Sequence, residues 1–222
     1  MALNKLKFSS INVTPVAGKA IKFNSSANGF ETGSAGGAMN TIKKLTASSS
    51  STLSFVDGSS DVVLDNTYKE YIFHFNNIHP ATDSAEFTFN LSADSGSNYN
   101  VTKTTSLFQT YHNEDESVDS GTAVQYTTAS DLAQSTAFQE LAVDCGNGND
   151  ECVSGTMQLF NPSSTTFVKH FVTNVNSYHA GNYTQQYFVA GYGNTTSAID
   201  AVQFKMSSGN IDAGDICLYG IN

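Results

Sequence analysis

The sequence predicts an all-β fold, an antiparallel β-sandwich of jelly-roll-like type that follows an extended N-terminal arm. Apolar and polar residues alternate over many short segments, which is the pattern of half-buried strands. Turn residues recur about every 10–15 residues, an interval too short for the crossover helices that parallel strands need. Only 14% of the residues are charged, against about 25% in an average globular domain. The sequence shows no internal repeat, which argues against a propeller or a solenoid.

Residues 1–40 differ from the rest and predict a docking arm with a linker at its end. The run GSAGGA at 33–38 has little to pack and is typical of a hinge. The apolar residues before it are too few to fold alone, so we expect them to be buried against another subunit. The alternative is a disordered segment or a first strand of the main domain. The expected interface residues are Leu3, Leu6, Phe8, Ile11, Ile21 and Phe23.

Residues 41–222 predict one sandwich domain of nine or ten strands. The candidate segments from which these strands are expected are 53–55, 62–64, 71–76, 87–91, 101–111, 123–126, 155–160, 167–173, 185–192 and a final pair after 200. Residues 130–138 are the helical candidate, with Ser130 as its cap, and should form about two turns at most.

The last 25 residues predict a β-hairpin that closes the sandwich. Val202, Phe204 and Met206 alternate with polar residues, and the apolar pattern resumes at Ile211 after the turn residues 208–210. In the second strand, Cys217 should point away from its neighbours Ile216 and Leu218.

Charge excludes several classes of partner. There are 20 acidic and 10 basic residues, a net charge of −10, so neither nucleic acid nor an anionic membrane surface is an expected partner. No apolar run approaches the roughly 18 residues of a membrane-spanning helix. The N-terminus lacks the apolar core of a secretory signal, so we expect synthesis in a cytoplasm without conventional export.

Three cysteines and one acidic loop leave two questions open. The odd count of cysteines argues against a disulfide framework, yet Cys145 and Cys152 bracket a loop that a disulfide could close. The same loop, residues 144–151, offers carboxylates and amides that suit a calcium ion. It does not match the EF-hand pattern, and a solvated turn is the simpler interpretation.

No motif for catalysis is present, and we expect no enzyme, no cofactor and no bound metal. The five histidines form no metal-binding pair; His74 and His170 should point away from neighbouring phenylalanines. The acidic clusters lie in turns, the serines lack a nucleophile-elbow context, and the glycine run at 33–38 lacks the lysine of a phosphate loop.

Tyrosines provide the alternative function, recognition of a carbohydrate. Tyr178, Tyr183, Tyr187 and Tyr192 lie in a stretch rich in Asn and Gln, a combination that suits a polar ligand. The competing interpretation is that these rings cover the edge of the sandwich core with their hydroxyls in water.

Five segments resemble a family of marine bacteriophage virion proteins: TIKKLTASSSSTLSFVDG (41–58), YIFHFNNIHPATD (71–83), FNPSSTTFVKHF (160–171), TTSAIDAVQF (195–204) and SGNIDAGDICLYGI (208–221). The resemblance covers about residues 41–222 and implies a tail fibre, a head knob or a capsid decoration protein located in the virion. It implies other virion proteins as partners and a homotrimer. The alternative that the tyrosines support is a carbohydrate-binding adhesin that recognises a host surface glycan. The resemblance supplies no catalytic residues.

Overall fold

The computed structural model describes residues 13–14, 16, 19–33, 37–115 and 124–222, and the chain divides into two units, Met1–Ala38 and Met39–Asn222. The first unit contains a two-stranded antiparallel hairpin, β1 (Ala20–Phe23) and β2 (Phe30–Gly33). The arm therefore contains a hairpin and is not extended throughout. Of the expected interface residues, Ile21 and Phe23 lie on β1, whereas Leu3, Leu6, Phe8 and Ile11 lie outside the described residues.

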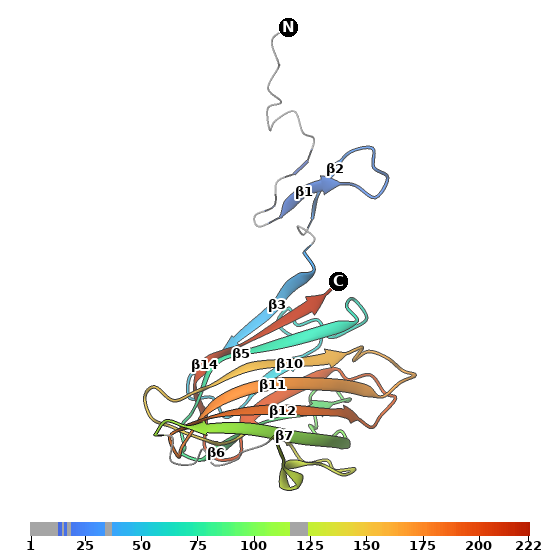
Figure 1. The fold of residues 1–222 in the computed structure, drawn as a ribbon. Helices are drawn as coiled ribbons and strands as arrows, with labels where there is room; N and C mark the ends of the chain where they lie inside the picture. Colours follow the sequence, from blue (N-terminus) through green and yellow to red (C-terminus); the bar gives the residue numbers. More distant parts are fainter. Residues whose placement is uncertain (1–12, 15, 17–18, 34–36, 116–123) are drawn as a thin grey trace, which may run out of the picture. The chain divides into compact units, whose positions relative to one another are not determined.

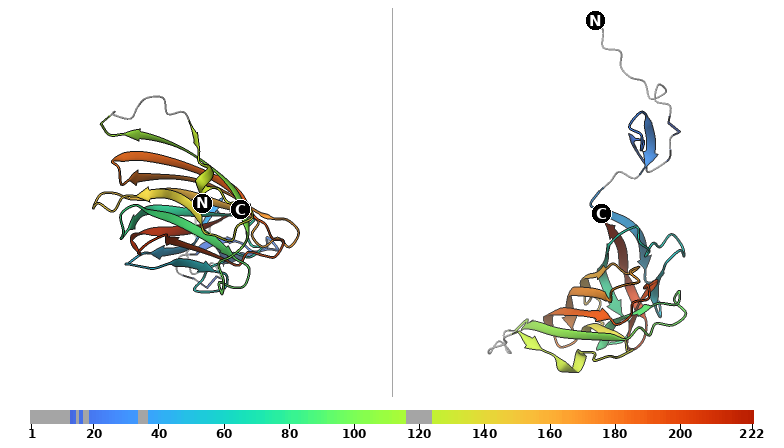
Figure 2. Two further views of the ribbon diagram at one scale, coloured as in Figure 1. Left: turned by 90° about the horizontal axis from the view of Figure 1, so that it is seen from below. Right: turned by 90° about the vertical axis from the view of Figure 1, so that its right-hand side faces the viewer.

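The second unit is the predicted all-β antiparallel sandwich, which confirms the fold class. Figure 1 shows its strands, and Figure 2 shows the same unit from two further sides. The strands of this unit are β3 (Met39–Thr46), β4 (Leu53–Val56), β5 (Glu70–Pro80), β6 (Ala85–Ser92), β7 (Lys103–Asn113), β8 (Gln125–Tyr126), β9 (Gln139–Cys145), β10 (Val153–Phe160), β11 (Lys169–His179), β12 (Tyr183–Gly193), β13 (Ala201–Met206) and β14 (Ile211–Ile221).

Two layers of unequal size make up the sandwich. The large layer has the order β3-β14-β5-β10-β11-β12-β7-β8, and the small layer has the order β9-β6-β13-β4. A single register pair, His179 with Cys145, joins β11 of the large layer to β9 of the small one. The small layer packs on one face of the large layer, so alternate side chains of strands such as β11 are buried between the layers and the others are exposed on the opposite, open face.

Phenylalanine rings fill the space between the layers. Phe55 of β4 meets Phe73 of β5 with ring centroids 5.3 Å apart, and Phe89 of β6 meets Phe171 of β11 at 4.9 Å. Phe204 of β13 lies in the middle, fully buried, and contacts rings from both layers. The predicted period-two alternation placed these side chains on the inner faces, where their burial supplies the main driving force for folding.

The helix predicted at 130–138 is wrong. The structure has a single 3₁₀ turn at Thr128–Ser130, and the chain after it is irregular. The backbone groups of this segment bind β7 instead of one another: Thr105 N–H donates to the Leu132 carbonyl at 2.9 Å, and Lys103 exchanges two bonds with Ser135 at 2.8 and 3.0 Å. Tertiary pairing thus overrides a weak helical preference.

The prediction that the two C-terminal strands pair with each other as a hairpin is also wrong, although both strands and the turn between them are present. β13 pairs with β4 and β6 in the small layer, whereas β14 pairs with β3 and β5 in the large layer. The turn, with Gly209 at φ +69°, carries the chain from one layer to the other. Cys217 does lie opposite His74, on the face away from the buried Ile216 and Leu218.

The structure differs from the sequence prediction at two further segments. Residues 62–64 form no strand, although Val62 and Leu64 are buried at 4% and 1% exposure. β9, at 139–145, was not predicted; it pairs with β6 through a ladder that contains irregularities on both sides of Phe87. Such irregularities break the alternation on which the sequence prediction relied.

Candidate functional site

The uncovered side of the large layer carries the surface with the most distinctive chemistry. We define the open face as the outward side chains of β10, β11, β12 and β7, which the strand registers place side by side. These are Ser154, Thr156, Gln158 and Phe160; His170, Val172, Asn174, Asn176 and Tyr178; Thr184, Gln186, Phe188, Ala190 and Tyr192; and Thr104, Ser106, Phe108, Thr110 and His112.

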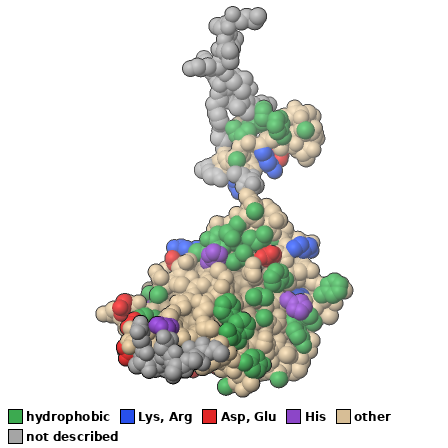
Figure 3. Space-filling model, viewed as in Figure 1, with side chains coloured by type: hydrophobic (Ala, Val, Ile, Leu, Met, Phe, Trp, Pro, Cys, Tyr) green, Lys and Arg blue, Asp and Glu red, His purple; other side chains and the backbone are tan. Residues whose placement is uncertain are grey.

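None of the side chains of the open face is Asp, Glu, Lys or Arg, in a protein whose net charge is −10. In Figure 3, which looks onto this side of the sandwich unit, most red and blue side chains lie toward the margins. Charge depletion combined with exposed aromatic rings is characteristic of the central part of recognition surfaces. The open face therefore suits an uncharged partner.

Aromatic rings lie at the centre of the open face. Phe108 and Phe188 are register partners on β7 and β12, and their rings stack with centroids 4.9 Å apart and planes inclined by 14°. Phe108 is 41% exposed and Val172 is 44% exposed. Tyr126 of β8, the register partner of Phe108 on its other side, is 62% exposed. An apolar area of this kind, rimmed by polar groups, marks a contact site more often than a bare solvent surface.

Two hollows meet at Phe188. One of about 410 Å³ extends over β5, β10 and β11 and includes Ile72, His74, Gln158 and Asn174 in its lining. The other, of about 130 Å³, lies between Phe108, Val172 and Ala190. Since Val172, Thr173 and Phe188 line both, the two hollows adjoin each other across the strands, and together they are called the depression below.

Amide side chains beside the depression are held by hydrogen bonds. Gln186 donates to Asn174, and Asn176 donates to the Thr184 hydroxyl at 2.8 Å. Gln158 Nε2 donates to the Glu70 carboxylate at 3.0 Å, at the margin of the open face. Each of these amides can still donate or accept another hydrogen bond. The depression therefore combines fixed polar groups with the rings of Phe108 and Phe188 in its lining.

The four tyrosines of the predicted sugar site do not form one surface. Tyr187 is fully buried, and its hydroxyl donates to the Val143 carbonyl at 2.8 Å. Tyr183 stacks on His179, with centroids 3.9 Å apart. Tyr178 and Tyr192 do belong to the open face, but they lie about 26 Å apart along the strands, at about 3.3 Å per residue.

Phe108 and Phe188 are the residues that sequence reasoning missed. Each occupies an outward position of its strand, where the alternation of apolar and polar residues leads one to expect a polar side chain. That break is the available signal, but only the strand registers show that the two rings stack.

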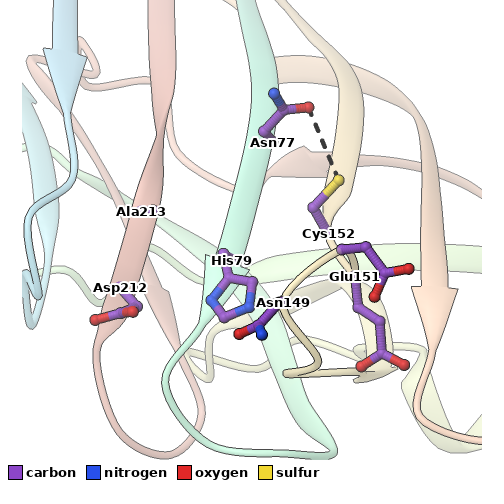
Figure 4. Close-up of a pocket in the computed structure, with 8 residues that line it drawn as sticks. Asn77, His79, Asn149, Glu151, Cys152, Asp212 and Ala213 are labelled. Carbon is purple, nitrogen blue, oxygen red and sulfur yellow. Dashed lines mark hydrogen bonds between the residues drawn. The ribbon is translucent and has the colours of Figure 1, made fainter.

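A separate hollow, of about 480 Å³, lies where β5 and β14 meet the loop before β10 (Figure 4). Its lining includes His79, Asp150, Glu151, Cys152 and Asp212. The His79 ring is within hydrogen-bond distance of the Gly148 carbonyl at 3.0 Å, and the Glu151 carboxylate accepts the Gly148 N–H at 2.5 Å. The His79 ring of β5 and the Glu151 carboxylate of the loop thus both hold the loop backbone at Gly148.

Neither a disulfide nor a cation cluster forms here. Cys145 and Cys152 are free thiols, so a Cys145–Cys152 disulfide is not present. Burial raises the pKa of Cys145 to about 12 and raises that of Cys152 as well, so neither is a thiolate nucleophile at neutral pH. Within the described part of the chain, no three His, Cys, Asp or Glu side chains are grouped so that they could hold a metal ion.

Three of the histidines contact tyrosine rings. As predicted, His74 and His170 lie on the faces opposite the buried phenylalanines beside them, and they contact the rings of Tyr219 and Tyr192. His179 lies 3.5 Å from the Asp144 carboxylate, but burial outweighs that charge and lowers the pKa of the imidazole. His179 is consequently neutral near pH 7.

Fold and surface together define a two-unit, all-β protein whose described residues include an open face with stacked aromatic rings and no charged side chains. Comparisons with protein-family models, with curated proteins and with solved structures find no match to this chain. Among the described residues, no helix has the length and apolar character needed to cross a bilayer.

Proposed function

We propose that this protein is a non-enzymatic structural component of a bacteriophage particle, a surface appendage such as a tail fibre, a knob or a capsid decoration. The N-terminal unit attaches it to other virion structural proteins, and the β-sandwich is displayed outward. The resemblance of residues 41–222 to phage virion proteins supports the class of particle, a homotrimeric assembly, and a location in the virion after synthesis in the host cytoplasm.

The observation that carries the attachment role is the apolar surface of the β1–β2 hairpin. Phe23 and Phe30 stack with centroids 5.0 Å apart, yet they remain 66% and 47% exposed, and Ile21 is 40% exposed. Strands of four residues cannot bury such side chains within their own unit, and an isolated two-stranded hairpin is marginally stable in water. A partner that covers these rings would remove apolar surface from water and stabilise the hairpin.

Deletion of residues 1–38 is expected to leave a soluble, folded sandwich that no longer joins phage particles. The sandwich keeps its own core, because the buried phenylalanines lie entirely after residue 38. Circular dichroism checks the fold, and immunoblots of purified particles check incorporation. The full-length variant Phe23→Ser should also lose incorporation, whereas Phe167→Ser, at a residue 69% exposed on the sandwich, should retain it. Particles that contain the truncated protein at normal levels would contradict the attachment role.

A second candidate function is a carbohydrate-binding adhesin, and the open face favours it. Neutral glycans present hydroxyl groups and apolar C–H patches, which match fixed amides beside the stacked Phe108 and Phe188 rings. Binding of a neutral glycan to an uncharged surface also buries no charged group, so it avoids the cost of removing a charge from water.

Substitution of Phe188 by alanine is expected to weaken glycan binding about fivefold, since loss of one aromatic contact corresponds to roughly 1 kcal/mol. Binding of the purified protein to host surface polysaccharide is measured by calorimetry or on a glycan array. Phe167→Ala is the matched control, because that ring is exposed but lies in the loop before β11. Absence of binding by the unaltered protein, together with normal adsorption of particles that lack it, would exclude the adhesin role.

A further inference from the structure

Two lysines are fully buried in the sandwich, Lys103 at the start of β7 and Lys169 at the start of β11. Gly193 of β12 is the register partner of both, so the two strands bring them to the same end of the large layer. Among the described residues, neither lysine has a carboxylate within ion-pair distance. Buried lysines without a counter-charge are rare and call for a chemical explanation.

The environment of Lys103 differs from that of Lys169 in one respect. Nζ of Lys103 donates to the carboxamide oxygen of Asn90 and, at 2.9 Å, to the Val101 carbonyl. Nζ of Lys169 contacts backbone carbonyls alone, those of Phe167 at 2.9 Å and Thr195 at 3.1 Å. Only Lys103 therefore has a side-chain amide, and hence an acyl group that it could attack, within hydrogen-bond distance.

Asn90 is held rigidly at this contact. It lies on the face of β6 opposite Phe89 and Leu91, and it is nevertheless fully buried. Its Nδ2 donates to the carbonyls of Tyr99 at 2.6 Å and Thr136 at 3.0 Å, and its Oδ1 accepts the Leu91 N–H at 2.9 Å. The carboxamide cannot rotate away from Lys103 without breaking these bonds, so the two groups are preorganised.

The protonation state of Lys103 fits a nucleophile. Burial lowers the pKa of its ammonium group to about 7, so a large fraction of the amine is neutral at physiological pH. The Leu91 N–H points at Oδ1, where negative charge develops when an amine adds to the carboxamide carbon.

We propose that Lys103 and Asn90 form an intramolecular isopeptide bond. The neutral Nζ attacks Cγ of Asn90, and a proton passes from Nζ to Nδ2. The Cγ–Nδ2 bond then breaks, and ammonia leaves. The product is a secondary amide that retains one N–H, and the step consumes no oxidant or co-reactant. The bond ties β6 of the small layer to β7 of the large layer, and it is independent of the proposed function.

The mass of the intact, purified protein tests this proposal. The expected mass is lower than that of the sequence by one ammonia molecule. After denaturation, trypsin should fail to cleave at Lys103 and should yield residues 70–169 as one fragment, since the chain has no arginine and no lysine between 103 and 169. Asn28–Gly29 and Asn147–Gly148 can also lose ammonia by closing to succinimides, so the loss of mass alone does not identify the isopeptide bond. Resistance of Lys103 to trypsin does identify it, because succinimide formation leaves Lys103 cleavable.

Variants separate the bond from other modifications. Lys103→Arg should be cleaved after position 103 and should yield residues 70–103 at their full sequence mass, because a guanidinium group is not a nucleophile here. Asn90→Asp should lose water in place of ammonia and reach the same final mass as the unaltered protein. Lys169→Arg, the matched buried lysine, should retain the ammonia loss. An unaltered protein with its full sequence mass and normal cleavage at Lys103 would overturn the proposal, whether or not any variant folds.

Discussion

Replacement of Phe204 by alanine is expected to lower the free energy of unfolding by about 3–5 kcal/mol, the range for a large aromatic side chain removed from a packed core. The Phe204 ring is fully buried and stands between the layers. Five rings surround it, with centroids 5.2–6.3 Å away: Phe55, Phe73, Phe75, Phe87 and Phe89. Because these neighbours belong to three other strands in both layers, the cavity that the substitution leaves cannot be filled by movement of a single strand.

Urea denaturation followed by circular dichroism measures this effect. Phe167→Ala is the matched control: the ring is 69% exposed, so its removal should change the free energy of unfolding by less than about 0.5 kcal/mol. Equal effects of the two substitutions would show that the rings between the layers do not form the principal core.

Replacement of Gly214 by alanine is expected to cost about 2–4 kcal/mol, because two unfavourable effects combine there. Gly214 has a φ of +111°, which side chains rarely tolerate. It lies in an irregular part of the β14–β5 ladder, where an added Cβ would come within 2.4 Å of the Asn77 carbonyl oxygen. That oxygen belongs to the backbone of β5, so relief requires a shift of the strand itself.

Gly58→Ala separates the two effects. Gly58 also has a positive φ, +72°, but an added Cβ there would meet nothing within 4 Å. The expected cost is about 1 kcal/mol, from the backbone conformation alone. The difference between the two variants, measured by urea denaturation, isolates the steric overlap at Gly214. A cost at Gly214 no greater than at Gly58 would show that β14 can move away from β5.

The strand content was predictable because alternation is a local property. Tyr71, Phe73 and Phe75 alternate with polar or half-buried residues and are all buried at 1% exposure or less. The failures lie where local pattern and tertiary pairing disagree. At 130–138, hydrogen bonds to β7 displaced a helical preference, and at β9 the irregular ladder with β6 concealed the strand.

The candidate site was predictable only in its chemical type. A neutral surface with aromatic and amide side chains followed from composition, and Tyr178 and Tyr192 do lie on the open face. Its centre could not be found, because Phe108 and Phe188 are separated by 80 positions in the sequence and meet only through the β7–β12 register. The Lys103–Asn90 contact was equally hidden, since nothing in the sequence marks either residue as buried.

For most strands, the sequence by itself determined that the segment extends and which of its faces is apolar, because side chains on successive strand residues point in opposite directions. Only the tertiary structure decided which strands pair. The segments around Gly209 illustrate this: each has an apolar face to bury, and that requirement is met equally by a hairpin within one layer or by two strands in opposite layers. The neighbours β4 and β6 on one side and β3 and β5 on the other selected the second arrangement.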